Sequence, residues 1–445
     1  MPNWKDSGVS DDTTGKRKPL VDGRSLIRQV IGGRATAALA DQAVFNAGNF
    51  LRGVILARMV TQGEFGLFTL GWTVIVFLQT VQATLVSGPY TVYCPRMKGA
   101  ALAKFTGSTI IHHLFLTVLL AVIGVCTSLS LTLIGNSKEI SVLGWAISIA
   151  IVPILLRDYI RRLCFARLWM SAAIAVDLST VVIQLGLLFA VGTIAGLSAA
   201  IAFVIIGSGC LIVTVSWIVK YRREIKVAWP QVSADWKRNW LLGRWALASA
   251  VLWVSATSLY PWMLAALHGA GAAGVWAACL GVVALCNPLL VGIQNFVLPK
   301  ASHVFADGGV GALRSFVPRA ALLIGGSATA LCVVLMPIGG WLVATLYGDS
   351  YSGNGLVVTL LLANFSILSF DFCFGRGLFI LERADIDFKI NIIPIIIVFL
   401  IGIWMVREFG VTGAASSILF GHFVVLILRI VSFFRVSEQE LCNPE

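Results

Sequence analysis

The feature that most constrains this chain is a series of apolar segments that are each long enough to cross a membrane. A helix of about 20 apolar residues spans the hydrocarbon core of a bilayer, which is roughly 30 Å thick. Hydrophobic residue types make up 58% of the 445 residues and charged types only 12%, while a soluble domain is about a quarter charged. The chain is therefore expected to be a polytopic membrane protein, and not a soluble enzyme, a DNA-binding protein or a secreted disulfide scaffold.

The apolar segments predict an all-α protein with twelve transmembrane helices, joined mostly by short loops. Lysine and arginine gather at every second connection, on the side of the N-terminus, while the opposite connections hold only Lys138 and Arg407. Because positive loops stay in the cytoplasm, both termini are predicted to be cytoplasmic, and most of the net charge of +12 reports topology and not a nucleic-acid site. The segments cover residues 37–59, 67–92, 106–134, 140–160, 169–193, 196–219, 241–267, 271–298, 318–346, 354–380, 388–406 and 410–434.

The same pattern divides the chain into five parts. Residues 1–35 are polar, lack the apolar core of a signal peptide, and are predicted to form a cytosolic tail. Two six-helix bundles are predicted at 36–219 and 241–435, with a basic, tryptophan-containing linker at 220–240 and a second cytosolic tail at 436–445. A linker of this composition is expected to lie at the cytoplasmic membrane edge, against anionic headgroups.

A weak internal repeat supports the division into two halves. The stretch ARMVTQGEFGLFTL, residues 57–70, aligns without gaps on AALHGAGAAGVWAA, residues 265–278. Six spans separate the two copies, so the repeat is parallel, and it predicts two like bundles that face each other across a central cleft. In each copy a helix is expected to leave the membrane, turn and re-enter. The matched glycines are Gly63 with Gly271 and Gly66 with Gly274.

One stretch of the sequence is similar to a known family. The run DQAVFNAGNFLRGVILARMVTQGEFGLFTLGW, residues 41–72, resembles the first-hairpin signature of polysaccharide exporters of the MOP flippase superfamily, of the Wzx/PST type. The run RRLCFARLW, residues 161–169, is similar to the basic cytoplasmic turn of these exporters. The resemblance covers the whole chain in length and layout but is specific only over the first of these runs. The second half departs from it, because no intramembrane basic residue there matches Arg52.

The resemblance implies a fold and a function. The fold would be a V-shaped, MATE-like pair of bundles that alternates between inward-open and outward-open states. The function would be to move a lipid-linked or nascent polysaccharide from the cytoplasmic to the outer face of the bacterial cytoplasmic (inner) membrane, without enzymatic chemistry and without a cofactor. The implied partners are the saccharide substrate, membrane lipids, and functionally a polysaccharide polymerase and glycosyltransferases.

Polar residues on the first span form a stripe. At 100° per residue Asp41, Gln42, Asn46, Asn49 and Arg52 fall in one arc. An ionisable side chain in hydrocarbon costs about 2.5–3.5 kcal/mol, so these residues are expected to line a cleft and bind substrate. Arg52 is the predicted anion contact, since a guanidinium is always charged and binds diphosphate oxygens in a fork. Asp41 is predicted either to close a gate or pair with a basic loop residue, or to be a charge at the helix N-terminus.

Two further aspartates are candidates for gating or ion coupling. Asp177 lies on the fifth span and is read as a site for a proton or Na⁺, as an acceptor for sugar hydroxyls, or as a structural hydrogen-bonding group. Asp371 lies on the tenth span and is expected either to couple ion movement to transport or to pair with Arg376.

Neutral polar and aromatic residues on other spans suit a carbohydrate. Glutamines, an asparagine and two aromatic side chains could bind hydroxyls or stack on a sugar ring, although an aromatic stripe is also typical of packing. No metal site is predicted, because the adjacent His112 and His113 point about 100° apart on a helix. The additional candidate substrate contacts are Gln79, Gln82, Trp253, Tyr260, Asn287 and Gln294.

Three functions compete for this pattern. A flippase for an anionic lipid-linked oligosaccharide agrees best with an arginine in the polar stripe. A multidrug or organic-cation antiporter of the same superfamily is the alternative, and it would favour a cleft dominated by carboxylates. A saccharide polymerase or ligase acting at the outer face is disfavoured, because every outer loop is short and almost free of acid and base groups.

Overall fold

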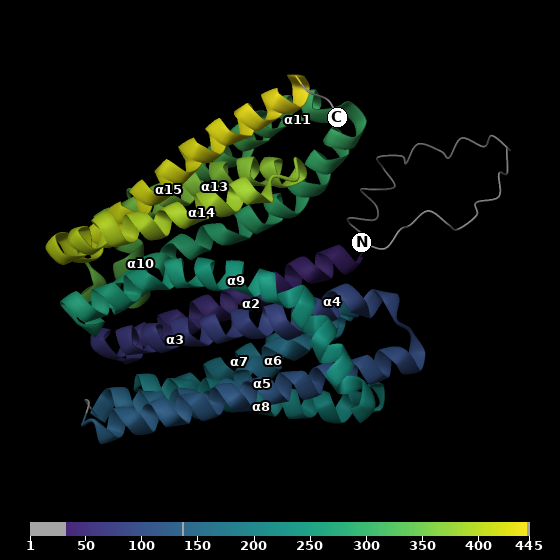
Figure 1. Ribbon diagram of the computed structural model, residues 1–445. Helices are drawn as coiled ribbons and strands as arrows, with labels where there is room; N and C mark the ends of the chain where they lie inside the picture. Colours follow the sequence, from purple (N-terminus) through teal and green to yellow (C-terminus); the bar gives the residue numbers. More distant parts are fainter. Residues whose placement is uncertain (1–32, 136–137, 443–445) are drawn as a thin grey trace.

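The computed structural model describes residues 33–135 and 138–442, and every regular element within these ranges is a helix (Figure 1). Nine of the described helices are long and apolar enough to cross a membrane, so the chain is an integral membrane protein. The first described helix, α2 (Gly33–Met59), is not among the nine, since Asp41, Arg52 and Arg58 lower its hydropathy.

The N-terminal half of the fold runs from α2 to α8. A π-helical segment, η1, interrupts the second span and ends two residues before Pro89. Proline lacks a backbone donor, and membrane helices accommodate it by such local adjustments. The other elements of this half are α3 (Gln62–Gln82), η1 (Ala83–Ser87), α4 (Gly88–Tyr93), η2 (Cys94–Arg96), α5 (Gly99–Leu133), α6 (Lys138–Ala166), α7 (Met170–Ile194) and α8 (Ala199–Tyr221).

Two long elements of the C-terminal half, α11 and α15, are each interrupted by a glycine. Gly309 within α11 and Gly410 within α15 adopt positive φ angles of 63° and 54°, which break the helix, so each of these elements consists of two helices joined at a glycine. The elements are η3 (Arg222–Glu224), α9 (Trp229–His268), α10 (Ala270–Val283), η4 (Ala284–Cys286), α11 (Asn287–Leu335), α12 (Gly339–Tyr347), η5 (Asp349–Tyr351), α13 (Gly355–Ile380), α14 (Ala384–Ile397), η6 (Val398–Gly402) and α15 (Ile403–Cys442).

The stretch expected as a linker at 220–240 is mostly helical. From Trp229 onward it forms the first turns of α9, which pack on the N-terminal half before the helix continues into the C-terminal half. His112 on α5 hydrogen-bonds the backbone oxygen of Val232 at 2.8 Å, and the Arg238 guanidinium lies 3.7 Å from the centre of the Tyr93 ring. One continuous helix therefore connects the two halves.

The two halves meet at the glycines that the repeat equates. A Cβ on Gly66 would lie 1.7 Å from the backbone oxygen of Ala270, and a Cβ on Gly274 would lie 2.5 Å from that of Gln62. In the repeat, Gln62 corresponds to Ala270 as Gly66 does to Gly274. The contact is thus reciprocal, as a two-fold relation between the halves requires. We call this the glycine contact.

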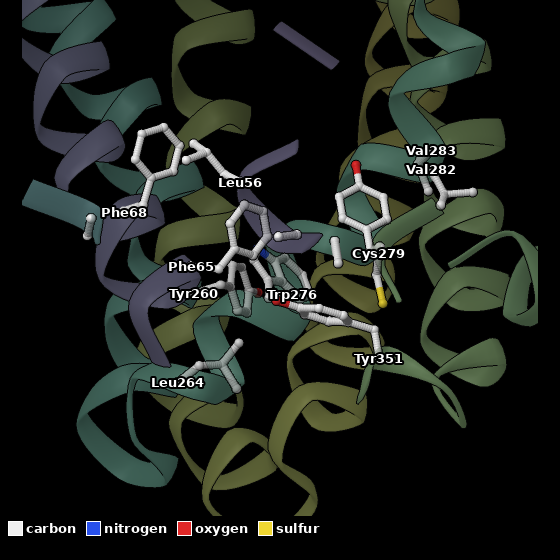
Figure 2. Packing of buried hydrophobic residues seen from close by; sticks show 14 of the residues in the cluster. Leu56, Phe65, Phe68, Tyr260, Leu264, Trp276, Cys279, Val282, Val283 and Tyr351 are labelled. Atoms are coloured by element: carbon white, nitrogen blue, oxygen red, sulfur yellow. The ribbon is translucent and has the colours of Figure 1, made fainter. Parts of the chain in front are cut away.

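Aromatic side chains surround the glycine contact. Figure 2 shows Phe65, Tyr260, Trp276 and Tyr351 converging from elements of both halves. Tyr260 stacks on Trp276 with ring centres 5.7 Å apart, and Phe65 meets Tyr351 edge to face at 6.2 Å. The glycines let the helix backbones approach closely, as small residues do between membrane helices, and the rings pack around that contact.

The helices diverge away from the glycine contact. In Figure 1 the two halves lie close together where α3, α9 and α10 meet, and they separate toward the end that holds α4 and the C-terminal turns of α15. At the closed end, Arg58 donates to the backbone oxygen of Leu346 at 2.8 Å and Gln62 donates to that of Ser350. The structure is therefore closed at one end of the membrane-spanning region.

Candidate functional site

Arg52 lies within the N-terminal half with neutral partners. Its guanidinium donates to Asn49 Oδ1 at 2.9 Å and to Gln184 Oε1 at 3.3 Å, and it lies 4.2 Å from the centre of the Trp72 ring. The residue is 8% exposed. Three helices, α2, α3 and α7, position this cation about 10 Å from the end of α2, at seven residues from Met59.

A second charged group joins α2, α6 and α7. Arg161 donates to Asp41 Oδ2 at 2.7 Å and to Asp177 Oδ2 at 2.6 Å, while Arg157 donates to Asp177 Oδ1 at 2.6 Å. The Phe45 ring lies under both guanidinium groups, at 4.4 Å from Arg161 and 5.4 Å from Arg157. Two carboxylates and two guanidinium groups balance in this cluster, which we call the N-half cluster.

The N-half cluster decides between the interpretations of Asp41. The described part of α2 is helical from Gly33 onward, so Asp41 lies more than two turns inside the helix, which contradicts the reading as a charge at the helix N-terminus. Asp41 does pair with a basic residue, but its partner Arg161 lies on α6 and not in a loop as expected. The run resembling a basic turn is helical up to Ala166.

The sequence missed the two arginines of this cluster as site residues. Arg157 and Arg161 lie near the predicted end of a span, where basic residues usually report topology. Their spacing of four places both on one face of α6, which was the available signal. Both lie largely out of solvent, with side chains 10% and 13% exposed.

The polar stripe of α2 is divided between two groups in the structure. Asn49 belongs with Arg52, whereas Gln42 Oε1 lies 3.4 Å from Arg161 Nη2 and its amide donates to Asn46 at 3.2 Å. Asp41 and Arg52, the charged residues at the two ends of the stripe, do not contact each other, because eleven helical residues span about 16 Å.

A third charged group lies in the C-terminal half. Arg429 on α15 donates to Asp371 on α13, lies 2.9 Å from an oxygen of Asp387 on α14, and donates to Asn391 at 2.8 Å. The expected pairing of Asp371 with Arg376 is wrong: the Arg376 guanidinium lies over the Phe372 ring at 4.7 Å. We call this the C-half cluster.

The C-half cluster holds more carboxylate than cation. Asp371 and Asp387 share the single guanidinium of Arg429, and Oδ1 of Asp371 accepts no hydrogen bond from the described residues. Asp371 and Arg429 are buried, whereas the Asp387 side chain is 34% exposed, so the excess negative charge lies at the more accessible side of the cluster. A carboxylate in excess of the available cation favours a bound proton or cation. Sequence reasoning counted Arg429 only as a charge at the end of a span.

A small cavity of about 30 Å³, with a mostly apolar lining and a few polar side chains, lies beside the C-half cluster. Tyr260, Asn391 and His422 line it, and the His422 ring lies 2.7 Å from Asn364 Oδ1. A volume of this size accommodates about two water molecules. The Tyr260 hydroxyl lies 3.1 Å from that of Ser417 and is buried, so the predicted aromatic platform packs inside the protein.

The other neutral candidates do not gather in one place. Gln82 is buried and donates to Ser87 at 2.7 Å, Gln79 is half-buried on the same helix, and Asn287 is exposed. The side chains of Trp253 and Gln294 lie outside the described residues. The contacts described for Arg52 are with Asn49, Gln184 and Trp72, and not with these residues.

The adjacent histidines have different surroundings. His112 packs against Trp236 with ring centres 5.2 Å apart, and His113 stacks on Tyr159 at 4.9 Å. In the described ranges no three histidine, cysteine, aspartate or glutamate residues form a group that could hold a metal ion.

An apolar groove of about 270 Å³ lies between the halves, and we call it the α3–α9 groove. Its walls come from one helix of each half, and the Trp262 Nε1–H group donates across it to Thr73 Oγ1 at 2.9 Å. The lining residues are Thr73, Val74, Phe77, Ser255, Ser258, Leu259 and Trp262.

Comparison with known proteins identifies the fold. No protein-family model and no curated protein sequence matches this chain. The inward-facing conformation of a multidrug resistance MATE family transporter of the MOP superfamily matches with a TM-score of 0.68 at 13% identity, over 88% of this chain and 94% of that one. The lipid II flippase MurJ, in an inward closed conformation, matches with a TM-score of 0.68 at 12% identity, over 92% and 90%.

An outward-facing MATE family transporter matches less well. Its TM-score is 0.60 at 14% identity, over 93% of this chain and 96% of that one. At these identities the likeness concerns the fold, and the chain has the fold of MOP-superfamily transporters.

Proposed function

We propose that this chain is a flippase that moves an anionic lipid-linked saccharide across the membrane by alternating access. The observation that carries the proposal is the unbalanced charge of Arg52. Among the described residues the other buried arginines, Arg157 and Arg429, each pair with aspartate, while Arg52 bonds only neutral groups. A buried guanidinium without a carboxylate favours an anionic ligand.

A phosphate or diphosphate fits this cation. The guanidinium fork binds phosphate oxygens with two parallel hydrogen bonds. Asn49 and Gln184 already fix the plane of the Arg52 group, and the Trp72 ring supports one face of it. The amide groups of Gln42 and Asn46, on the same helix, suit saccharide hydroxyls.

The proposed topology has twelve spans with both termini in the cytoplasm. Gly309 and Gly410 divide α11 and α15 into two helices each, which supports a count higher than the nine long apolar helices. The distribution of lysine and arginine then assigns the glycine contact to the outer side. The proposed halves are the bundles 36–219 and 241–435.

Alternating access follows from this assignment. In the described state the glycine contact closes the outer side, and the divergence of the halves toward α4 supports access from the cytoplasm. Arg161, which joins Asp41 to Asp177, lies between the cytoplasmic end and Arg52 and is suited to act as a gate. For outward release the halves must separate at the glycine contact.

The C-half cluster is the proposed site of ion coupling. Asp371 has an oxygen without a described hydrogen-bond partner and shares Arg429 with Asp387, whereas Asp177 is balanced by two arginines. A proton or Na⁺ at Asp371 would neutralise the excess charge. This favours Asp371 over Asp177 as the coupling residue.

An organic-cation antiporter is the second candidate. The excess carboxylate of the C-half cluster favours it, and a MATE family multidrug transporter shares the fold. Arg52 opposes it, because a fixed cation repels a cationic substrate. The two candidates therefore make opposite predictions for Arg52.

The proposed setting is the bacterial cytoplasmic membrane. A lipid-linked saccharide on the cytoplasmic face requires glycosyltransferases that build it, and its transfer outward would supply a polymerase. The flippase itself would need no covalent step, since it only changes the leaflet in which the substrate lies.

Transport in vesicles tests the proposal. Purified protein is reconstituted into liposomes with a fluorescent polyprenyl-diphosphate oligosaccharide, and its movement between leaflets is followed with a membrane-impermeant quencher. Losing charged hydrogen bonds worth about 1.5–3 kcal/mol should slow flipping by Arg52→Gln roughly ten- to hundred-fold. Arg52→Lys, which keeps the charge, should retain a larger share of the rate.

Two results would contradict the proposal. Wild-type rates in the Arg52→Gln protein would remove the anion site. Export of a fluorescent organic cation that improves in Arg52→Gln, together with no movement of the diphosphate lipid by the unaltered protein, would favour the antiporter.

A further inference from the structure

The glutamine that contacts Arg52 has a fixed orientation. Gln184 on α7 is buried, and its Oε1 accepts from Arg52 Nη1 at 3.3 Å. Its Nε2 donates to the backbone oxygen of Ile206 on α8 at 3.0 Å and to Cys210 Sγ at 3.4 Å. A backbone oxygen only accepts and a guanidinium only donates, so a reversed amide would lose both bonds. The Gln184 oxygen therefore faces the cation.

Close helix packing holds Gln184 beside Arg52. A Cβ on Gly209 of α8 would lie 2.9 Å from Gln184 Cγ, so the glycine leaves room for this side chain. A Cβ on Gly48 of α2 would lie 2.2 Å from Val181 Cγ2 on α7, so these two helices also approach closely. The helices that carry the amide and the cation are thus packed directly against each other.

Two residues on one face of α7 contact arginines in different ways. Asp177 and Gln184 lie seven residues apart and both are buried, so they share a face of the helix. Asp177 accepts from Arg157 at 2.6 Å and neutralises it, whereas Gln184 accepts from Arg52 and leaves its charge in place. This face of α7 therefore supplies a carboxylate at one arginine and an amide at the other.

A carboxylate at position 184 would change the charge of the Arg52 site. Glutamate has the shape of glutamine but is negative when ionised, and it would form a buried ion pair with Arg52. The paired guanidinium would have no excess charge for an anionic ligand. The contact with α8 opposes a carboxylate, because its second oxygen would face the Ile206 oxygen to which Gln184 now donates.

We propose that Gln184 determines the sign of the charge that the Arg52 site accepts. As an amide fixed by α8, it binds the guanidinium without neutralising it, and so keeps the site selective for an anionic headgroup. Gln184 is thus a specificity-determining residue that acts through Arg52. This inference rests on the proposed function and extends it, because it names the residue that decides between an anionic and an uncharged lipid.

Lipid binding tests this assignment. Native mass spectrometry of the full-length protein in detergent compares the occupancy of a polyprenyl diphosphate with that of an uncharged polyprenol of the same length. The unaltered protein should prefer the diphosphate. Gln184→Glu should lower this preference at least about ten-fold, because the charged hydrogen bonds of Arg52 are then made to the new carboxylate. Polyprenol binding should be unchanged, whereas a general packing defect would weaken the binding of both lipids.

The order of two variants separates charge from hydrogen bonding. Gln184→Met has a similar length and no charge, so it should lower the preference less than about three-fold. A role as hydrogen-bond acceptor alone predicts the opposite order, because glutamate accepts from Arg52 and methionine does not. Thr214→Val is the control on α8: it removes a buried hydroxyl that bonds none of the described residues and should leave the preference unchanged.

A double variant tests whether Gln184 acts through Arg52. In the Arg52→Gln background, Gln184→Met should cause no further loss of preference, whereas independent effects would multiply. Asn49→Asp is a second way to neutralise the cation, since Asn49 Oδ1 accepts from Arg52 at 2.9 Å and the residue is only half-buried. It should also lower the preference at least about ten-fold, and it replaces Gln184→Glu if size-exclusion profiles show that variant to be unfolded.

The outcomes separate this inference from the proposed function. A diphosphate preference that Gln184→Glu retains, that Gln184→Met lowers equally, or that falls further in the double variant would overturn the role of Gln184. If Gln184→Glu is unfolded, a preference retained in Asn49→Asp overturns it. With a clear loss in Arg52→Gln, such results leave the proposed function in place. If the unaltered protein shows no preference, or Arg52→Gln retains it, the proposed function fails as well.

Discussion

The two halves of this protein place charge at corresponding distances along the chain but balance it differently. In the N-half cluster Arg161 precedes Asp177 by sixteen residues, and in the C-half cluster Asp371 precedes Asp387 by the same number. In the N-terminal half this spacing joins Arg161 and Asp177 in a balanced cluster with Asp41 and Arg157. In the C-terminal half it separates two aspartates, Asp371 and Asp387, which share one cation, Arg429 of α15.

The difference assigns different tasks to the halves. A balanced set of buried charges with good geometry ties α2, α6 and α7 together and has little reason to take up another ion. An unbalanced set is stabilised by an ion that binds there. The N-half cluster is thus suited to hold structure and close a path, and the C-half cluster is suited to bind a coupling ion.

The largest expected effect comes from breaking the balanced cluster. Asp177→Asn removes the carboxylate that Arg157 and Arg161 share, and leaves buried positive charge. Removing one partner from a buried ion pair costs about 3–5 kcal/mol of the free energy of unfolding. Denaturant titration of the purified protein in detergent measures this loss.

Asp158→Asn is the matched control for this prediction. Asp158 pairs with Arg162, whose side chain is 44% exposed, so the cation left behind stays in contact with polar surroundings. The expected loss is less than about 1 kcal/mol. Equal losses in the two variants would show that the N-half cluster does not hold the helices together.

A smaller effect on stability is expected from the unbalanced cluster. Asp371→Asn leaves Arg429 paired with Asp387 and Asn391, and the expected cost is about 1.5 kcal/mol. Its main effect should be on transport, because the excess negative charge is gone. Flipping rates are measured with an imposed pH gradient and with an imposed Na⁺ gradient. In Asp371→Asn the rate should no longer depend on the gradient of the ion that couples to transport.

The N-half cluster is expected to have no part in ion coupling. Asp177→Asn protein that still folds should keep that gradient dependence. If Asp371→Asn retains the full dependence and Asp177→Asn loses it, the tasks of the two clusters are reversed.

At the glycine contact the two halves make equivalent contacts, so substitutions in either half should have similar effects. Gly66→Leu and Gly274→Leu each force a side chain against the backbone of the other half, and overpacking of this kind costs about 1–3 kcal/mol. Both should therefore disfavour the closed state to a similar degree. The Gln62 side chain donates to the backbone oxygen of Ser350 at this end, so disulfide formation between Gln62→Cys and Ser350→Cys reports how often the end is closed.

Gly63→Leu and Gly271→Leu are the controls, since both glycines have no atom nearer than 3.8 Å to an added Cβ. They should leave the disulfide yield unchanged. A loss in only one of the Gly66 and Gly274 variants would contradict the reciprocal contact.

Much of the fold could be predicted from the sequence. The length of the apolar segments indicated membrane helices, and the glycines of the repeat lie at the contact between the halves. Pairing of Asp41 with a basic residue was one of the predicted alternatives, although the partner was expected in a loop and lies on α6. These features depend on local hydropathy, chain spacing and the small size of glycine.

The partners of the buried charges could not be predicted in the same way. Arg157, Arg161 and Arg429 resembled basic residues at the ends of spans, and Arg376 was the nearest candidate in sequence for Asp371. Which residues meet depends on how each helix is rotated against helices far away in the chain. The rotation of a helix relative to distant helices cannot be predicted from the local sequence of that helix.

By itself the sequence determined that this protein lies in a membrane and where close approach of two helices is sterically possible, because both follow from side-chain size and polarity along single helices. Only the tertiary structure decided which arginines are neutralised and which one is left with neutral partners. Ion pairs between helices depend on distances of a few ångströms in three dimensions, and the packing of the whole bundle sets those distances.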